Sequence, residues 1–300
     1  MKQLFKNLKR LHPETTGLKP EISFEKDINT VLFDIYGTLL ISASGDISSS
    51  NLKWKAALSA FAECGISIKA DTEKEKEIVG ESILKEYFYA IKQSHKNSKK
   101  NGIEFPEVNI IDIWQQTVST LQSSFEINIE KPIDFEKMAI TFEFLNNPTF
   151  PMPGMKEVLE KLSKEGITLG IISNAQFFTP MIMSFFLSDH NNISQKIPLF
   201  NNSLCVYSYE YGRAKPGIFL YEKSAAKLRE HVILPENILY IGNDMLNDIY
   251  PAQQLGFKTA LFAGDQRSLR LRKDNPAIEK IKPNHIITEL NQILTIVINK

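Results

Sequence analysis

The side chains in this sequence that could do chemistry stand where short apolar runs end. Asp34, Ser173, Lys215 and Asp244 all lie at or after the end of such a run. If the runs are parallel strands, their carboxyl ends meet at one edge of a sheet, which is where ligands bind in open α/β folds. Carboxylate, hydroxyl and ammonium groups gathered there would form a site for a small polar ligand.

Each of these residues has an ordinary structural interpretation when taken alone. Asp34 suits a turn or a helix cap, Ser173 suits a turn, and Lys215 suits a solvated surface. Asp244 and Asp248 are four residues apart, on one face of an expected helix start, where carboxylates favour the positive helix end. The residues therefore become a site only if the fold brings them together.

The elements that must position them are strands alternating with helices. We expect strands at 30–33, 168–172, 204–207, 238–241, 259–262 and 285–287. Helices are expected at 155–164, at 217–228 and up to residue 254. This alternation predicts an α/β fold, with a doubly wound, parallel, Rossmann-like sheet.

Residues 46–148 have a different character, because apolar residues recur there at helical spacing. Four amphipathic helices of this kind can bury their apolar stripes against one another as a small bundle. We expect a helical cap domain at 46–148, inserted into a core formed by 29–45 and 149–300, with 1–28 as an extension that packs on the surface or moves. The lysine-rich stretch Lys96–Lys100 is expected as a solvated loop between helices. A cap in this place would close over the strand ends and select the substrate.

Composition excludes several classes of function. The chain has 300 residues, and its 35 basic and 35 acidic side chains balance, so no global positive field is available for nucleic acid or an anionic membrane. No run approaches the roughly 18 apolar residues that a membrane span needs. Cys64 and Cys205 fit no metal-ligand spacing, which favours reduced thiols in a cytoplasmic protein.

Four segments occur in an order typical of one family. They are residues 33–39 (Phe-Asp-Ile-Tyr-Gly-Thr-Leu), 170–175 (Gly-Ile-Ile-Ser-Asn-Ala), 215–217 (Lys-Pro-Gly) and 241–248 (Ile-Gly-Asn-Asp-Met-Leu-Asn-Asp). Together they resemble the four motifs of the haloacid dehalogenase-like (HAD) hydrolase superfamily. The resemblance covers roughly residues 30–44 and 148–292.

The resemblance implies a nucleophile and a metal. Asp34 would attack the electrophile and form a covalent aspartyl intermediate. Mg²⁺ would offset the repulsion between this carboxylate and a phosphate. Its ligands would be Asp34, the backbone carbonyl of Tyr36 and an acid of the fourth motif. We expect Asp244 as the direct ligand and Asp248 as a water-mediated or lysine-facing acid, with Asn243 as an alternative donor.

The resemblance also implies a substrate cradle. Ser173 would donate a hydrogen bond to a substrate oxygen, beside backbone N–H groups near Asn174. Lys215 would balance the negative charge, while Tyr36 and Thr38 would line the turn after the nucleophile. The substrate implied is a small phosphorylated compound.

One position departs from the phosphatase pattern. Phosphatases of the family usually carry a second Asp two residues after the nucleophile, which protonates the leaving group, but this chain has Tyr36. A tyrosine with a pKa near 10 is a poor base at neutral pH, and losing a general acid–base typically costs about 10²–10⁴-fold in rate. Either hydrolysis is slow, or the cap supplies the proton, or the leaving group needs none.

The Asp-x-Tyr-Gly-Thr form leaves two other interpretations open. Haloacid dehalogenases of the superfamily carry it, and they release halide without a proton or a metal. Against this, the fourth motif keeps Asp244 and Asp248, and residues 39–42 offer no arginine to clamp a carboxylate. The third interpretation is a protein that keeps the fold to bind a ligand, with little turnover.

Overall fold

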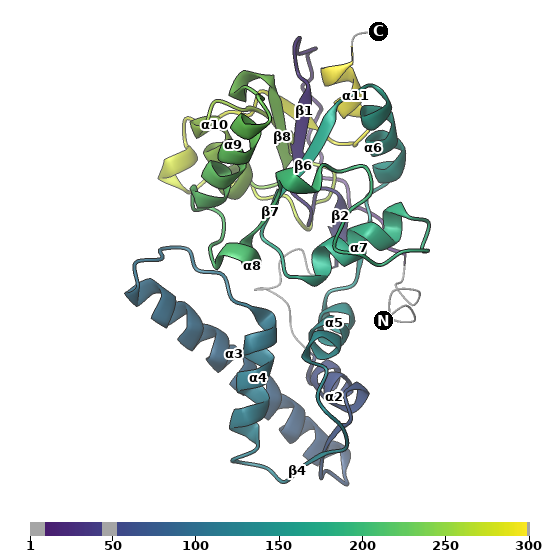
Figure 1. Ribbon diagram of the computed structural model, residues 1–300, viewed down its shortest axis with the longest axis vertical. Helices are drawn as coiled ribbons and strands as arrows, with labels where there is room; N and C mark the ends of the chain where they lie inside the picture. The colour runs from purple at the N-terminus through teal and green to yellow at the C-terminus, as the bar shows by residue number, and fades with distance from the viewer. Residues whose placement is uncertain (1–9, 44–52, 299–300) are drawn as a thin grey trace. The chain divides into compact units, whose positions relative to one another are not determined.

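The computed structural model describes residues 10–43 and 53–298. These residues form two compact units, one made of residues 53–148 and the other of residues 10–43 together with 149–298. Within the described ranges, no helix has both the length and the apolar character that a membrane crossing requires. Figure 1 shows the elements of both units.

The larger unit is built on one parallel sheet. In spatial order its strands are β10 (His285–Ile287), β9 (Lys258–Phe262), β8 (Ile238–Gly242), β1 (Thr30–Phe33), β6 (Thr168–Ser173) and β7 (Cys205–Tyr207). Every adjacent pair is parallel. The central strand, β1, is buried along its whole length because helices cover both faces of the sheet. The predicted α/β sheet is therefore confirmed.

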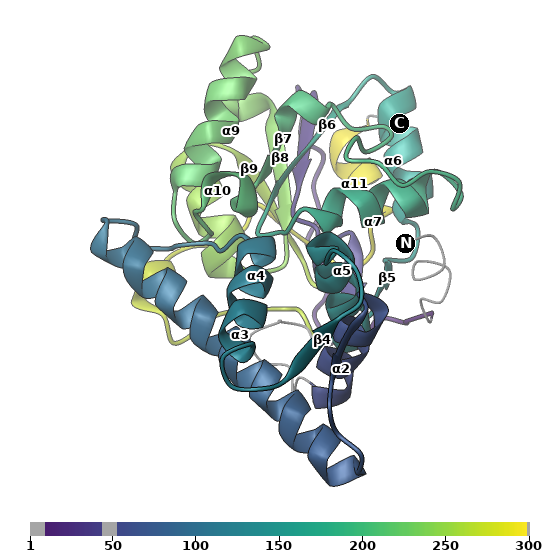
Figure 2. The same cartoon turned by 60° about the horizontal axis from the view of Figure 1, so that its bottom comes forward.

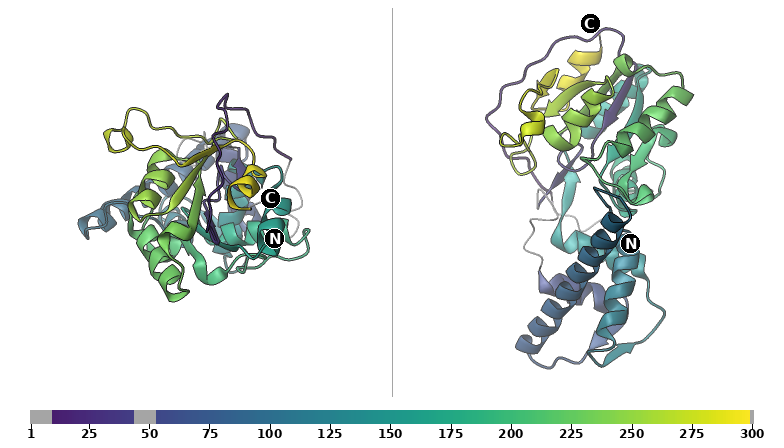
Figure 3. Two further views of the ribbon diagram at one scale, coloured as in Figure 1. Left: turned by 90° about the horizontal axis from the view of Figure 1, so that it is seen from above. Right: turned by 90° about the vertical axis from the view of Figure 1, so that its left-hand side faces the viewer.

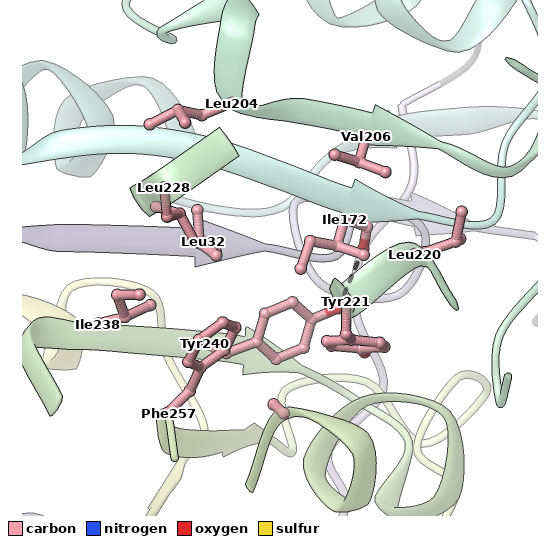
Figure 4. Close-up of a cluster of buried hydrophobic side chains, with 11 residues drawn as sticks. Leu32, Ile172, Leu204, Val206, Leu220, Tyr221, Leu228, Ile238, Tyr240 and Phe257 are labelled. Atoms are coloured by element: carbon pink, nitrogen blue, oxygen red, sulfur yellow. Dashed lines mark hydrogen bonds between the residues drawn. The ribbon is translucent and has the colours of Figure 1, made fainter. Parts of the chain in front are cut away.

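Helices cover the two faces of this sheet. The described helices of the unit are α6 (Met155–Lys164), α7 (Phe178–Leu187), α8 (Ser208–Tyr211), α9 (Phe219–Glu230), α10 (Tyr250–Gln254) and α11 (Gln292–Val297). Short 3₁₀ turns lie at Asn202–Leu204, Pro235–Asn237 and Pro276–Ile278. On one face, α9 and α10 pack against apolar side chains of β1, β6, β7 and β8, including Leu32, Ile172 and Tyr240 (Figure 4). On the other face lie α6 and α11 (Figure 1).

The chain leaves and re-enters this unit through a small antiparallel pair. β2 (Leu40–Ser42) pairs with β5 (Thr149–Pro151) in antiparallel register. The N–H of Met152 also donates to the carbonyl of Leu39. The pair ties the two ends of the insertion together directly after the turn that follows Asp34.

The smaller unit is a helical bundle with one short hairpin. It contains α2 (Trp54–Glu63), α3 (Glu73–Lys100), α4 (Ile110–Leu121) and α5 (Phe135–Asn146), and β3 (Ile66–Ile68) pairs antiparallel with β4 (Ile127–Ile129) (Figure 2). Its core is aromatic: the Trp114 ring contacts those of Phe61, Tyr87 and Phe142. The four predicted helices are present, whereas the hairpin was not predicted.

The expectation of a loop at Lys96–Lys100 is wrong. These residues form the last turn of α3, which starts with a capping box between Thr72 and Glu75 and runs for 28 residues. Lysines near a helix C-terminus interact favourably with the partial negative charge there. The polar residues of this stretch therefore form a solvated face of a helix and do not indicate a loop.

The described part of the N-terminal extension packs along the larger unit. Glu21 forms an isolated antiparallel bridge with Ile286 of β10. The N–H of Glu14 donates to Asp265, and the Thr16 hydroxyl donates to the carbonyl of Ala263. Figure 3 shows this segment running beside the C-terminal part of the chain. Residues 1–9 lie outside the described ranges.

Candidate active site

Asp34 is placed at the centre of the sheet edge. It comes directly after β1, and its N–H donates to the carbonyl of Ile241 on β8 at 2.8 Å. Because β1 lies between β6 and β8, the ends of both neighbouring strands flank it. The residue is 7% exposed, so its carboxylate is largely withdrawn from water.

Two side chains donate hydrogen bonds to one oxygen of Asp34. The Ser173 hydroxyl lies 2.9 Å from Oδ1, and Lys215 Nζ lies 2.7 Å from the same atom. Among the residues that the structure describes, no hydrogen bond to Oδ2 is present. The arrangement holds the carboxylate by Oδ1, and a carboxylate oxygen such as Oδ2 is chemically able to act as a nucleophile.

Lys215 joins Asp34 to the last acid of the fourth motif. Its Nζ lies 2.7 Å from Asp248 Oδ1 as well, and Tyr240 donates to the same Oδ1 at 3.1 Å. Burial disfavours the charged form of Lys215, but the attraction of Asp248 and Asp34 outweighs it and raises the pKa of this ammonium. Burial also raises the pKa of Asp248 above the ordinary value of a carboxyl group, although the charge of Lys215 opposes the shift. Lys215 is therefore a fixed cation shared by two carboxylates.

The backbone of the fourth motif leaves space for the Asp248 carboxylate to approach Lys215. A Cβ on Gly242 would lie 2.4 Å from Cγ of Asp248, so only glycine leaves space for that carboxylate above the end of β8. The following residues, Met245–Ile249, form one π-helical turn before α10. Asp248 Oδ2 accepts the N–H of Asp244 at 2.9 Å and so closes the start of the turn.

Asn243 lies against the turn that follows Asp34. Its Oδ1 accepts from the Thr38 hydroxyl at 3.1 Å, and its Nδ2 donates to the carbonyl of Ser268 at 2.6 Å. Gly37, at φ +84°, sits directly over this amide, since a Cβ there would lie 2.7 Å from Nδ2. Thr38 thus ties the loop after Asp34 to the fourth motif.

Asp244 forms an ion pair with a residue that the sequence did not predict. Its Oδ2 lies 2.7 Å from an Nη of Arg272, and Arg272 Nε lies 3.2 Å from the same oxygen. Its Oδ1 accepts the N–H groups of Leu246 and Asn247, which makes it the cap of the π-helical turn. Nothing in the sequence indicates Arg272, because the pairing depends on the path of the loop after β9.

The remaining predicted residues have local partners. The Tyr36 hydroxyl shares a 2.9 Å hydrogen bond with Thr179 on α7. The Asn174 side chain accepts from the N–H of Lys215 at 2.8 Å and donates to its carbonyl at 3.2 Å. Asn174 therefore fixes the backbone that presents Lys215.

These donors do not fit a divalent metal well. Mg²⁺ demands near-octahedral oxygen coordination and is usually held by free carboxylates. Here both oxygens of Asp248 accept protein hydrogen bonds, both oxygens of Asp244 are engaged, and Asn243 is uncharged. The described residues include no cluster of three acidic, histidine or cysteine side chains that could hold a metal ion. The implied Mg²⁺ thus has one uncommitted carboxylate oxygen, Asp34 Oδ2, within the described residues.

A family model for haloacid dehalogenase-like hydrolases matches residues 28–256 of this chain. The chain belongs to this family of hydrolases. The matched range includes Asp34, Ser173, Lys215 and Asp248, the four residues that the structure joins by hydrogen bonds.

The individual proteins to which this chain is similar have low sequence identity to it. A glyceraldehyde 3-phosphate phosphatase of Pyrococcus furiosus is 28% identical over 148 residues, which cover 48% of this chain and 53% of that protein. The match thus spans about half the length of this curated relative. The 2-haloacid dehalogenase of Pseudomonas syringae is 17% identical, with 89% of this chain and 96% of that chain covered and a TM-score of 0.53. The hydrolase YfnB of Bacillus subtilis, solved bound to magnesium, is 16% identical over 90% of this chain and 98% of that chain, with a TM-score of 0.44.

Proposed function

We propose that this hydrolase cleaves small phosphorylated metabolites through a covalent intermediate on Asp34. The single observation that carries the proposal is the asymmetric support of that carboxylate, with Ser173 and Lys215 both on Oδ1. The partial similarity to a protein named a glyceraldehyde 3-phosphate phosphatase supports phosphate as the group transferred.

The reaction has two steps that balance. Asp34 Oδ2 attacks phosphorus and forms an O–P bond while the bond to the leaving oxygen breaks. Water then attacks the phosphorus of the aspartyl phosphate, which releases orthophosphate and restores the carboxylate, and the proton of the water passes to the product or to solvent. Lys215 stays a cation throughout and limits the repulsion between the acids.

The substrate we favour has a weakly basic leaving group. Tyr36 stands where phosphatases of the family carry a proton-donating acid, and its hydroxyl is hydrogen-bonded to Thr179. A tyrosine does not supply the proton that an alkoxide leaving group requires. An acyl phosphate releases a carboxylate, which needs no proton, so acyl phosphates are the preferred substrate class.

A panel of phosphorylated compounds tests this proposal. Orthophosphate release is measured from acetyl phosphate, p-nitrophenyl phosphate and glycerol phosphate, in Mg²⁺ and in EDTA, after subtraction of spontaneous hydrolysis. We expect acetyl phosphate to react about 10²–10⁴-fold faster than glycerol phosphate. Equal enzymatic rates would show that a proton donor is present and would overturn the choice of substrate class.

Two observations favour a second candidate, hydrolysis at a carbon centre. The Asp-x-Tyr-Gly-Thr segment resembles the form that haloacid dehalogenases carry, and the pairing of Asp244 with Arg272 weakens the argument that this acid serves a metal. In that reaction Asp34 Oδ2 displaces halide from carbon, and water hydrolyses the resulting ester. Chloride release from 2-chloropropanoate, together with no orthophosphate from any compound of the panel, would favour this candidate.

A further inference from the structure

Asp244, which caps the π-helical turn of the fourth motif, already pairs with a cationic side chain. Asp244 faces the Arg272 guanidinium through two nitrogens, at 2.7 and 3.2 Å, while its second oxygen caps the turn. An isolated ion pair on a surface contributes little, but a bidentate arginine on a carboxylate is a strong and directional contact. The Asp244 side chain is only 7% exposed, whereas the Arg272 side chain is 37% exposed, so water reaches this pair mainly from the arginine side.

The loop that carries Arg272 is fixed to the fourth motif by its backbone. The N–H of Arg270 donates to the carbonyl of Asn243 at 2.9 Å, and the carbonyl of Arg270 accepts from Met245 at 2.9 Å. These two bonds make a parallel bridge on either side of Asp244. Arg272 is therefore presented to the carboxylate by the main chain.

Arg272 also holds a backbone conformation that side chains rarely adopt. Its φ is +50°, in the left-handed region. A residue other than glycine in a sparsely populated region is strained and persists where the surroundings hold it. Here the strained residue is the one whose side chain neutralises Asp244.

We infer that Arg272 takes the place of a divalent metal at this centre. With Lys215 shared by Asp34 and Asp248, and Arg272 on Asp244, two fixed cations face the three carboxylates. A metal ion would have to displace the guanidinium before Asp244 could ligate it. The inference rests on the proposed Asp34 centre, and it makes Arg272 a positioning residue that sets the metal affinity of the protein.

Metal binding measured without substrate tests the inference. Mn²⁺ is titrated into the purified full chain, and free Mn²⁺ is followed by electron paramagnetic resonance. We expect Arg272→Gln to bind one Mn²⁺ at least about tenfold more tightly than the wild type, which corresponds to about 1.4 kcal/mol. The matched control is Lys273→Gln, which removes a neighbouring exposed cation and should bind like the wild type.

Two outcomes would overturn the inference. One is a wild-type protein that binds Mn²⁺ as tightly as Arg272→Gln; the other is equal tightening by Lys273→Gln. If Arg272→Gln does not fold, Arg272→Lys keeps the charge without the bidentate contact and should still tighten binding, by a smaller factor. Because no substrate is present, a failed phosphatase assay would leave this result unaffected.

Discussion

At the scale of single residues, the two oxygens of Asp34 have different surroundings. Ser173 and Lys215 both donate to Oδ1. This division fixes the orientation of the carboxylate. In the reaction that we propose, Oδ2 would then be available to the electrophile, and the nucleophile would be preorganised before substrate arrives.

Restoring an acid at residue 36 tests the assignment of the missing proton donor. Tyr36→Asp should raise the rate of glycerol phosphate hydrolysis by about 10²-fold, because a carboxyl group can protonate an alkoxide leaving group. The rate on acetyl phosphate should change far less. Steady-state orthophosphate release from both substrates measures the two effects.

The control for this substitution is Tyr36→Phe. It removes the hydrogen bond to Thr179 and adds no acid, so it should leave the preference for acetyl phosphate intact. A gain on glycerol phosphate from Tyr36→Phe as large as that from Tyr36→Asp would contradict the assignment.

The sequence indicated the central residues of the site better than it indicated the partner of Asp244. Asp34 directly follows β1 and Ser173 ends β6, and these strands pair in parallel, so the meeting of these two residues follows from the strand pattern. Lys215 lies eight residues beyond β7, and its motif rather than a strand end indicated it. The partner of Asp244 could not be predicted in this way. Arg272 lies ten residues beyond β9, and the bridge between Arg270 and Asp244, with the hydrogen bond from Asn243 to Ser268, brings its loop back to the fourth motif.

At the scale of elements, the end of β8 governs the position of Asp248. Gly242→Ala would place a methyl group where the Asp248 carboxylate now lies, 2.4 Å from its Cγ. We expect a loss of about 1–3 kcal/mol in the free energy of unfolding, as for overpacked cores, together with a large loss of activity. Urea unfolding and orthophosphate release measure the two effects.

A second glycine provides the matched comparison. Gly166 has φ +79°, and a Cβ there would contact nothing within 4 Å. Gly166→Ala should therefore lower stability through backbone strain alone and should leave the activity of the folded protein unchanged. If Gly242→Ala keeps full activity, the contact between β8 and Asp248 does not position the acid.

Element types were predicted well, because apolar periodicity separates strand from helix. Element ends were predicted less well where polar residues continue a helix, as at Lys96–Lys100 in α3. The antiparallel pairs β2–β5 and β3–β4 consist of three-residue strands, too short for any alternation to be visible.

At the scale of the whole molecule, the helical unit has a buried acid of its own. Glu143 on α5 is 8% exposed, and its Oε1 accepts a hydrogen bond from Asn147. Burial raises the pKa of Glu143 to about 7, above an ordinary value of 4.5, although the hydrogen bond opposes the shift. Burial in the folded protein therefore favours the protonated form of Glu143.

This shift predicts how stability depends on pH. A pKa raised by folding contributes stability that is fully present below pH 4.5 and is lost as the pH rises through about 7. We expect the free energy of unfolding of the helical unit to fall by up to about 3 kcal/mol from this group. Glu143→Gln should remove that part of the pH dependence and stabilise the protein at pH 8.5.

Urea unfolding at pH 5 and pH 8.5 provides the measurement. Glu136→Gln changes an exposed acid on the same helix and should keep the wild-type difference between the two pH values. If Glu143→Gln keeps that difference as well, the buried carboxyl is not its source.

The most direct test of the proposed function compares the wild type with Asp34→Asn. Orthophosphate release from acetyl phosphate is followed for both proteins, with circular dichroism to show that both are folded. We expect the amide to lower the enzymatic rate by at least about 10³-fold, because it cannot form the aspartyl phosphate. Release by Asp34→Asn at the wild-type rate, or no enzymatic release by the wild type, would contradict covalent phosphate transfer at this residue.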